Sequence, residues 1–405
     1  MCSSDLAAQA AEALAFDRAA KLYRLALEMG PGDDALARRL RVGLADALAN
    51  AGRGPESVRE YLAAVARATV AESLDRRRRA ATQYLISGHI DEGIAELATV
   101  LKAVGMAPPK TPRRAVLSLI LHRLKIRMRG LHFHPRDASQ VSPDDLTRID
   151  VCWAAASGLG IVEPVRGAEF QARGMMLALR AGEPYRIARA LVYEASHVSS
   201  AGGPSQRRVA TLAQAAEKIA QQLADPYLLG GIFTAHGVAA YMSGQWKRGG
   251  ELLDRAAAIH RTQCTGATFE FDSSTTFSLW SLQFRGELAE LSRRWPVVLK
   301  DALERGDRHM LTNLNTFLMS TLRLAADDPD GAEATLRPTL DHLTRQGFQV
   351  QHNEWFGAEV QIRLYRGDGV GAWNFLETRY SPSLARSHLM RVRSEEHTSE
   401  LQSPA

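Results

Sequence analysis

The stretch from Leu44 to Val104 decides the fold, because it contains the same helix–turn–helix unit twice. Residues 44–66 read LADALANAGRGPESVREYLAAVA, and residues 81–104 read ATQYLISGHIDEGIAELATVLKAV. In each unit one helix ends at a glycine, Gly52 or Gly88, and a second helix follows. Glycine suits this place because it adopts the left-handed backbone conformation without a Cβ clash. The two glycines are 36 residues apart, so the pattern predicts a repeated helical hairpin.

Hydrophobic residues recur at helical spacing in these units, which predicts amphipathic helices that pack on their neighbours. One stripe comprises Val58, Tyr61, Leu62 and Val65, the next comprises Ile94, Leu97, Leu101 and Val104, and an earlier one comprises Phe16, Ala19, Ala20, Tyr23 and Leu27. A single pair of helices cannot bury such a stripe alone, so stacking of successive pairs must supply the core.

Further turns predict that the array continues along the chain. They fall at Gly182, Gly244, Gly286, Asp328 and Gly367, and the last three steps are 42, 42 and 39 residues. We therefore predict an all-α protein, an α-solenoid of about eight or nine antiparallel helix pairs. The early spacing lies near the tetratricopeptide period of about 34 residues, whereas the later repeats are longer.

The composition agrees with this class. The 405 residues are 45% hydrophobic and only 7% aromatic, which favours packed helices over a β-sandwich. No uncharged apolar stretch of about 18 residues occurs, so we expect no membrane span. Three widely spaced cysteines predict neither a disulfide framework nor a metal site. No secretory signal is visible, so we expect a cytoplasmic protein.

The sequence divides into five segments. Residues 1–6 and 394–405 resemble peptides translated from sequencing-adapter DNA, and we expect neither to contribute to the fold. Residues 7–104 are predicted to form tetratricopeptide-like repeats, and residues 142–393 to form the longer helical repeats. Residues 105–141 interrupt the array, because three prolines near their start end the preceding helix.

A helix is predicted inside this interruption. Thr111 and Pro112 form a plausible N-cap and first turn. Residues 115–129 follow as AVLSLILHRLKIRMR, in which Leu117, Ile120, Leu121, Leu124 and Met128 lie on one helical face. The last six residues also alternate as a strand would, but the helical flanks favour a helix.

The same segment is strongly basic. Its candidate partner-binding patch comprises Arg113, Arg114, Arg123, Lys125, Arg127 and Arg129. Such a patch can bind nucleic acid, anionic lipid or an acidic partner. The alternative is a solvated helix whose arginine stems cover apolar surface. No aromatic ladder accompanies the patch, so we do not expect a nucleic-acid partner.

Motifs for catalysis are absent from the sequence. It contains no H-E-x-x-H, paired C-x-x-C, G-x-S-x-G, G-x-x-x-x-G-K-[ST], H-R-D or D-F-G. We therefore predict no catalytic residue, no metal ligand and no cofactor. We interpret His132 and His134 as loop histidines, and Gly158 and Gly160 as small residues at a helix contact. The aromatic segment after Cys264 either lines a ligand cavity or packs in the repeat core.

Three phrases carry a resemblance to a known family. They are RIDVCWAAASGLGIVEPVRGAEFQARGMMLALRAGEPYRIARAL at 148–191, LAELSRRWPVVLKDALERGD at 288–307 and RLAADDPDGAEATL at 323–336. Together they resemble the C-terminal helical-repeat region of large bacterial serine/threonine protein kinases, which follows a kinase domain and an AAA-type ATPase module. No kinase or ATPase motif maps onto any residue of this sequence.

The resemblance implies a non-catalytic fragment, the scaffold and sensing arm of such a kinase. It would bind protein partners, or the neighbouring kinase and ATPase domains, on its concave face. The alternative is the effector-binding arm of an ATPase-linked transcriptional activator, whose repeats are similar. A third hypothesis is an enzyme with a site that no motif reveals.

Overall fold

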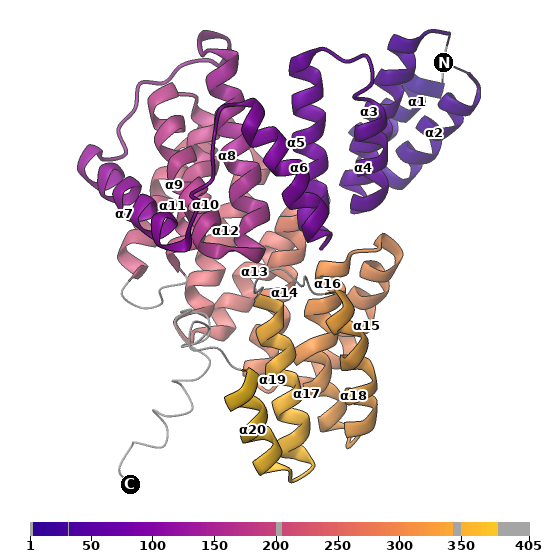
Figure 1. Cartoon of the computed structure of the whole chain (residues 1–405), viewed down its shortest axis with the longest axis vertical. Coiled ribbons are helices and arrows are strands. Elements are labelled where there is room, and N and C mark those ends of the chain that lie inside the picture. The colour runs from indigo at the N-terminus through magenta and orange to yellow at the C-terminus, as the bar shows by residue number, and fades with distance from the viewer. Residues whose placement is uncertain (1–2, 31, 200–204, 343–349, 380–405) are drawn as a thin grey trace.

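The chain folds into a superhelix of paired helices (Figure 1). The computed structural model describes residues 3–30, 32–199, 205–342 and 350–379, and throughout these ranges the regular structure is helical. This confirms the predicted all-α solenoid. The predicted terminal segment 394–405 lies outside the described residues. Of the other terminal segment, residues 3–6 belong to the first helix.

Successive helices pair through short turns. The pairs are α1 (Ser3–Glu12) with α2 (Phe16–Glu28), α3 (Asp34–Asn50) with α4 (Gly54–Ala63), α5 (Val70–Ile86) with α6 (Ile90–Ala103), α8 (Pro143–Val162) with α9 (Pro164–Ala181), α10 (Pro184–Ser199) with α11 (Gln206–Leu223), α12 (Pro226–Tyr241) with α13 (Trp246–Gln263), α14 (Thr268–Phe284) with α15 (Leu288–Arg305), and α19 (Val350–Tyr365) with α20 (Gly369–Arg379). Between α15 and α19, the short segments α16 (Arg308–Asn313), η3 (Leu314–Leu318) and α17 (Met319–Ala325) follow one another and precede α18 (Pro329–Leu336) and η4 (Arg337–His342).

The predicted turns all lie at helix ends, although Gly182, with a φ of +83°, follows α9 and so separates two pairs. Gly52, Gly88, Gly244, Gly286 and Gly367 all follow the first helix of a pair, with φ between +69° and +85°. An L-residue with a side chain rarely adopts this conformation, which explains the glycine at each turn. The turn at Asp328 is of another kind, because its carboxylate caps α18 by accepting from the Gly331 N–H at 2.9 Å.

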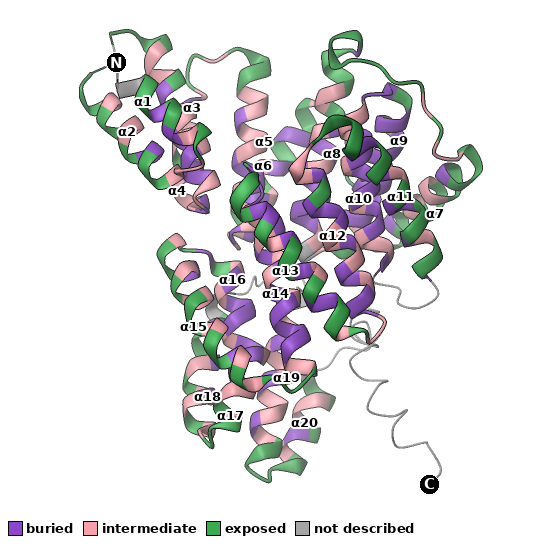
Figure 2. Ribbon diagram, turned by 180° about the vertical axis from the view of Figure 1, so that it is seen from behind, coloured by how far each residue is buried: buried purple, intermediate pink, exposed green. Residues whose placement is uncertain are grey.

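The core is distributed between neighbouring pairs, as stacking requires. Leu97 and Leu101 are 2% and 3% exposed, and they share a cluster with Leu85 of α5, Val151 of α8 and Phe170 of α9. A larger cluster joins α9 to α12, where Figure 2 shows buried residues on helix after helix. The apolar stripes of the second helices therefore bury between successive pairs.

Helix α7 (Pro112–Arg129) is an additional helix that lies in the sequence between the α5–α6 and α8–α9 pairs. It confirms the predicted helix over the alternative strand. The Thr111 hydroxyl accepts from the Arg114 N–H at 3.3 Å, as the predicted N-cap should. α7 packs along α9. After it, the short helix η1 (Ala138–Gln140) precedes α8, whose N-cap residue Ser142 makes no side-chain capping bond.

The superhelix brings its early turns against its late helices. A Cβ on Gly88, between α5 and α6, would lie 2.9 Å from the backbone nitrogen of His309 in α16. A Cβ on Gly52, between α3 and α4, would collide with the side chain of Arg305 at the end of α15. Repeats more than 200 residues apart are therefore in contact, so the curved array nearly closes around a central space.

Among the helices of the described residues, none combines the length and the apolar character that crossing a lipid bilayer requires.

Candidate functional site

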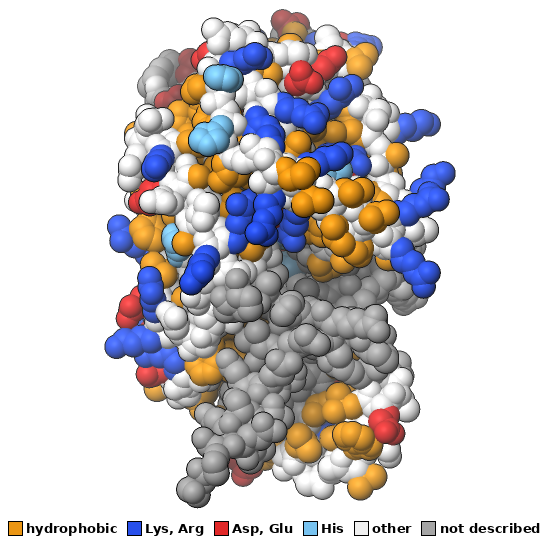
Figure 3. Space-filling view, turned by 90° about the vertical axis from the view of Figure 1, so that its left-hand side faces the viewer, with side chains coloured by type: hydrophobic (Ala, Val, Ile, Leu, Met, Phe, Trp, Pro, Cys, Tyr) orange, Lys and Arg blue, Asp and Glu red, His pale blue; other side chains and the backbone are white. Residues whose placement is uncertain are grey.

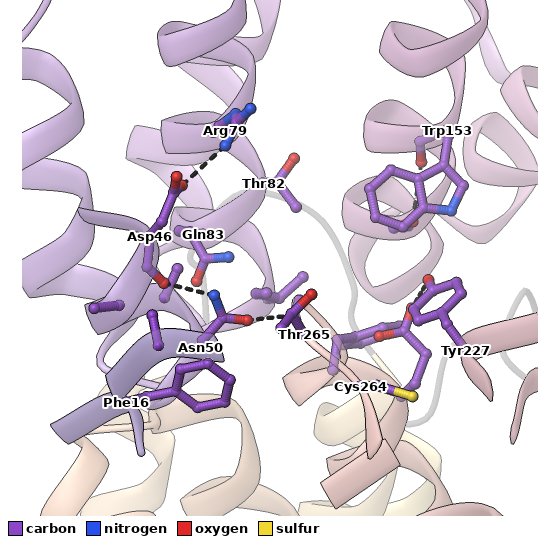
Figure 4. Close-up of a pocket in the computed structure, with 18 of the residues that line it drawn as sticks. Phe16, Asp46, Asn50, Arg79, Thr82, Gln83, Trp153, Tyr227, Cys264 and Thr265 are labelled. Atoms are coloured by element: carbon purple, nitrogen blue, oxygen red, sulfur yellow. Dashed lines mark hydrogen bonds and ion pairs between the residues drawn. The ribbon is translucent and has the colours of Figure 1, made fainter. Parts of the chain in front are cut away.

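The central space is a cavity of about 870 Å³. Its lining comes mainly from α3 and α5 on one side, with a few residues of α1, α2 and α4, and from α8, α10, α12, the α13–α14 loop and the start of α14 on the other (Figure 4). The volume falls in the range of about 300–1,000 Å³ that is typical of ligand pockets. First helices of pairs, α3, α5, α8, α10, α12 and α14, supply most of this lining, which makes the concave face the candidate site.

Asp46 of α3 organises the first wall. Its Oδ1 accepts hydrogen bonds from the Tyr61 hydroxyl and from Arg79 Nη1, the latter at 2.9 Å. Arg79 also donates from Nε to Asp75 at 2.7 Å. Burial by itself would lower the pKa of Arg79, but Asp46 and Asp75 outweigh it and raise that pKa. The guanidinium on this wall is therefore fully charged and already compensated by two carboxylates.

Asn50, at the end of α3, joins the two walls. Its Nδ2 donates to the Asp46 carbonyl at 2.8 Å, and its Oδ1 accepts from the Gly266 N–H in the α13–α14 loop. Next to it, the Thr268 hydroxyl donates to the Ala49 carbonyl at 3.3 Å. The bonds to Gly266 and from Thr268 connect residues more than 200 positions apart, and Figure 4 shows the one at Asn50.

The second wall presents a cation held between aromatic rings. The Arg189 Cζ lies 4.7 Å from the ring centroid of Trp153 and 5.5 Å from that of Tyr185. Arg189 Nη2 donates to Asp150 at 2.6 Å. Burial would raise the pKa of Asp150, but Arg189 and Arg186 lower it below its ordinary value. Stacking and ion pairing together hold the Arg189 guanidinium in place on this wall.

Glu270 of α14 adds a carboxyl group that resists ionisation. It is 9% exposed and accepts a hydrogen bond from the Tyr227 hydroxyl at 2.8 Å. Burial raises the pKa of Glu270 to about 7, although the bond from Tyr227 partly opposes this shift. A carboxyl group in this state can donate or accept a hydrogen bond near neutral pH.

The cavity is built for binding. Its one thiol, Cys264, is buried, and burial raises its pKa to about 11, so a thiolate nucleophile does not form near pH 7. The cations Arg79 and Arg189 each hold a carboxylate partner. A highly charged ligand such as a phosphate would have to displace those partners, whereas apolar groups and amides fit the aromatic rings and polar side chains.

The two interpretations of the aromatic segment each hold for part of it. Cys264 and Phe269 line the cavity. Phe277 and Trp280 pack edge to face with their ring centroids 5.0 Å apart, and both contact Tyr241 inside a repeat core. One segment therefore serves both roles, because the two faces of α14 point in different directions.

The predicted basic patch lies elsewhere. All six residues are on α7, and none lines the cavity. Arg113, Arg114, Lys125 and Arg127 are exposed, whereas Arg123 forms an ion pair with Glu194 at 2.9 Å. Arg129, although exposed, donates to the backbone carbonyl of Leu179 at 2.9 Å.

The small-residue interpretation of the glycine pair in α8 is confirmed. A Cβ on Gly158 would collide with the Leu85 side chain of α5. Gly160 faces Gly167 of α9, where an added Cβ would lie 2.6 Å from the Gly160 nitrogen. These glycines allow close helix approach next to the cavity wall.

Sequence reasoning missed most of the cavity residues. Asp46, Asn50, Trp153, Arg189 and Glu270 carry no motif, and they converge only through the curvature of the superhelix. The available signal was their common position on the first helix of a pair.

Comparisons with known proteins give structural likeness alone. No family model and no curated protein matches the chain. Solved structures that match along nearly its whole length include the following two. The crystal structure of Rap protein complexed with Competence and Sporulation Factor has a TM-score of 0.56 at 11% identity, covering 98% of both chains. Yeast Tom70 has a TM-score of 0.34 at 12% identity, covering 99% of this chain and 95% of that chain.

The helical fold and its likeness to the Rap protein structure define the fold class. The chain is a tetratricopeptide-like helical-repeat protein, an α-solenoid whose inward helices enclose a ligand-sized cavity. Such a fold presents an extended concave surface.

Proposed function

We propose that this chain is a non-catalytic binding arm whose central cavity takes a short peptide segment of a protein partner. One observation carries the proposal: two walls from distant repeats meet around aromatic rings and ion-paired charges. Apolar side chains of the peptide would contact the aromatic rings. Its backbone amides would form hydrogen bonds with the polar side chains that line the cavity.

A ligand in this position touches both walls at once. It would therefore favour the closed arrangement in which Asn50 contacts Gly266. A ligand shifts a conformational equilibrium only when it binds one state more tightly, and a ligand that spans two walls meets this condition. Binding in the cavity would thus change the relative positions of the two ends of the array.

We assign this arm to a cytoplasmic bacterial serine/threonine protein kinase, on the strength of the three sequence phrases quoted above. The alternative parent is an ATPase-linked transcriptional activator. A longer genomic read separates the two: V-A-I-K and H-R-D motifs before residue 7 would support the kinase, whereas a DNA-binding module without them would support the activator.

Peptide selection tests the cavity. A pool of random seven-residue peptides is selected on the full chain and, in parallel, on a Gln83→Trp variant, in which an indole occupies the cavity beside Asn50 (Figure 4). The matched control is Gln222→Trp on the exposed face of α11. We expect wild type and control to enrich the same peptides and Gln83→Trp to lose them. Equal enrichment by all three, or none by wild type, would refute the proposal.

A further inference from the structure

Helix α7 carries an apolar face that points away from the protein. Its members are aliphatic and are between 43% and 72% exposed: Val116, Leu117, Ile120, Leu121, Leu124 and Met128. Figure 3 views the side of the molecule on which α7 lies, and hydrophobic side chains gather there among lysine and arginine. An exposed aliphatic cluster of this kind on one helix marks an interaction surface.

The opposite side of α7 is fixed to the solenoid by buried acids. Ser118 donates to Glu169 of α9 at 2.9 Å, and Arg123 pairs with Glu194 of α10 at 2.9 Å. Both glutamates are at most 3% exposed. Turning the helix to bury its aliphatic face would remove these partners from two buried carboxylates, which is unfavourable. The aliphatic face is therefore held outward by the fold.

The charge of this surface is of one sign. Pro112–Arg129 contains no acidic residue, and Arg113, Arg114, Lys125 and Arg127 are exposed. With 100° per residue, Arg113 and Arg127 fall within the aliphatic sector, and Arg114 and Lys125 lie along one edge of it. Long basic side chains in these places can reach the headgroup level while their stems remain in contact with apolar groups.

We propose that α7 docks the protein on a membrane surface rich in anionic lipid. The helix, about 27 Å long, lies in the interfacial plane with its aliphatic side chains among the acyl chains and its basic groups near the lipid phosphates. The aliphatic side chains of the outward face offer no hydrogen bonds, which suits acyl chains, and the basic side chains among and beside them suit lipid phosphates. A second copy of the chain fits less well, because pairing two such helices would bring like charges together. None of these residues lines the cavity, so docking leaves the proposed peptide site open.

Vesicle co-sedimentation tests this proposal directly. The full chain is mixed with vesicles of equal parts phosphatidylglycerol and phosphatidylcholine, or of phosphatidylcholine alone. We expect binding to the anionic vesicles that weakens as salt is raised, and little binding to the neutral ones.

Two variants separate the contributions. One combines Leu117→Ser, Ile120→Ser and Leu124→Ser, and the other combines Arg113→Gln, Lys125→Gln and Arg127→Gln. Each should lower the partition onto anionic vesicles at least about tenfold. The matched control, Val297→Ser with Leu303→Ser on α15, removes exposed aliphatic groups elsewhere and should bind as wild type does. All the substituted side chains are exposed, so we expect each variant to fold. Circular dichroism verifies this.

The contrary results are well defined. The absence of binding to phosphatidylglycerol vesicles would overturn the proposal, and so would variants that bind as tightly as the control. A Glu- and Leu-rich helical peptide that binds α7 when the vesicles do not would also overturn it, and would assign the face to an acidic protein partner.

Discussion

Replacing Gly88 by alanine tests whether distant repeats hold each other in place. Gly88 has a φ of +85°, and a Cβ there would lie 2.9 Å from the His309 nitrogen and 3.0 Å from the Arg308 Cβ. The left-handed conformation costs an alanine about 1–2 kcal/mol. Overpacking against the α16 backbone adds about 1–3 kcal/mol, since a backbone atom cannot move aside cheaply. We expect Gly88→Ala to lower local stability by about 2–5 kcal/mol in total.

Gly286→Ala is the matched control. Gly286 also lies at the turn within a pair and has a φ of +69°, but an added Cβ would meet no atom within 4 Å. Gly286→Ala should therefore lower stability only through the left-handed backbone conformation, by about 1–2 kcal/mol. Hydrogen exchange followed by mass spectrometry measures both variants. Gly88→Ala should speed exchange in α5, α6 and also α16, whereas Gly286→Ala should leave α16 close to wild type. Equal effects of the two variants on α16 would refute the contact between distant repeats.

Three further predictions concern packing, charge and pH. Leu97→Ala should lower the free energy of unfolding in urea by about 2–5 kcal/mol, because Leu97 is 2% exposed. Lys125→Ala, on the exposed side of α7, should stay within about 0.5 kcal/mol of wild type. A larger loss for Lys125→Ala than for Leu97→Ala would contradict the packing described. Arg123→Ala should destabilise by about 1–3 kcal/mol, since it leaves the buried Glu194 without its ion-pair partner, and a loss no larger than that of Lys125→Ala would show that the pair contributes nothing. The pKa of Glu270 is raised to about 7, so between about pH 4.5 and 7 the folded state holds a proton that the unfolded state has released, and stability should fall as pH rises through this range. The free energy of unfolding of Glu270→Gln should therefore rise relative to that of wild type between pH 5 and pH 7.5. The same pH dependence of stability in both proteins would contradict this.

Local sequence features predict the repeats well. Turn glycines such as Gly52 and Gly88 need a left-handed backbone, and this need is visible from a single residue and its helical neighbours. The same holds for the Thr111 N-cap, whose partner is three residues away. At these positions the cause of the structural feature lies within one turn of helix, and sequence reasoning found it. It did not find every local cap, because Ser142 opens α8 without a side-chain capping bond.

Features that depend on distant partners were not predictable in this way. The hydrogen bond of Asn50 with Gly266 joins residues 216 positions apart, and no pattern near either residue announces it. The aliphatic stripe of α7 was correctly placed on one helical face, but its orientation depends on Glu169 and Glu194, which lie on later helices. The cavity likewise depends on the curvature of the whole array, to which every pair contributes a small rotation.

Hydrogen exchange with and without a selected peptide tests the central claim most directly. If the cavity holds the peptide between its two walls, protection should rise in α3 and α5 of one wall and, in the same sample, in α10 and α14 of the other. The outward helices α11 and α13 should change little. Protection confined to outward helices, or to one wall alone, would contradict a binding site enclosed by the superhelix.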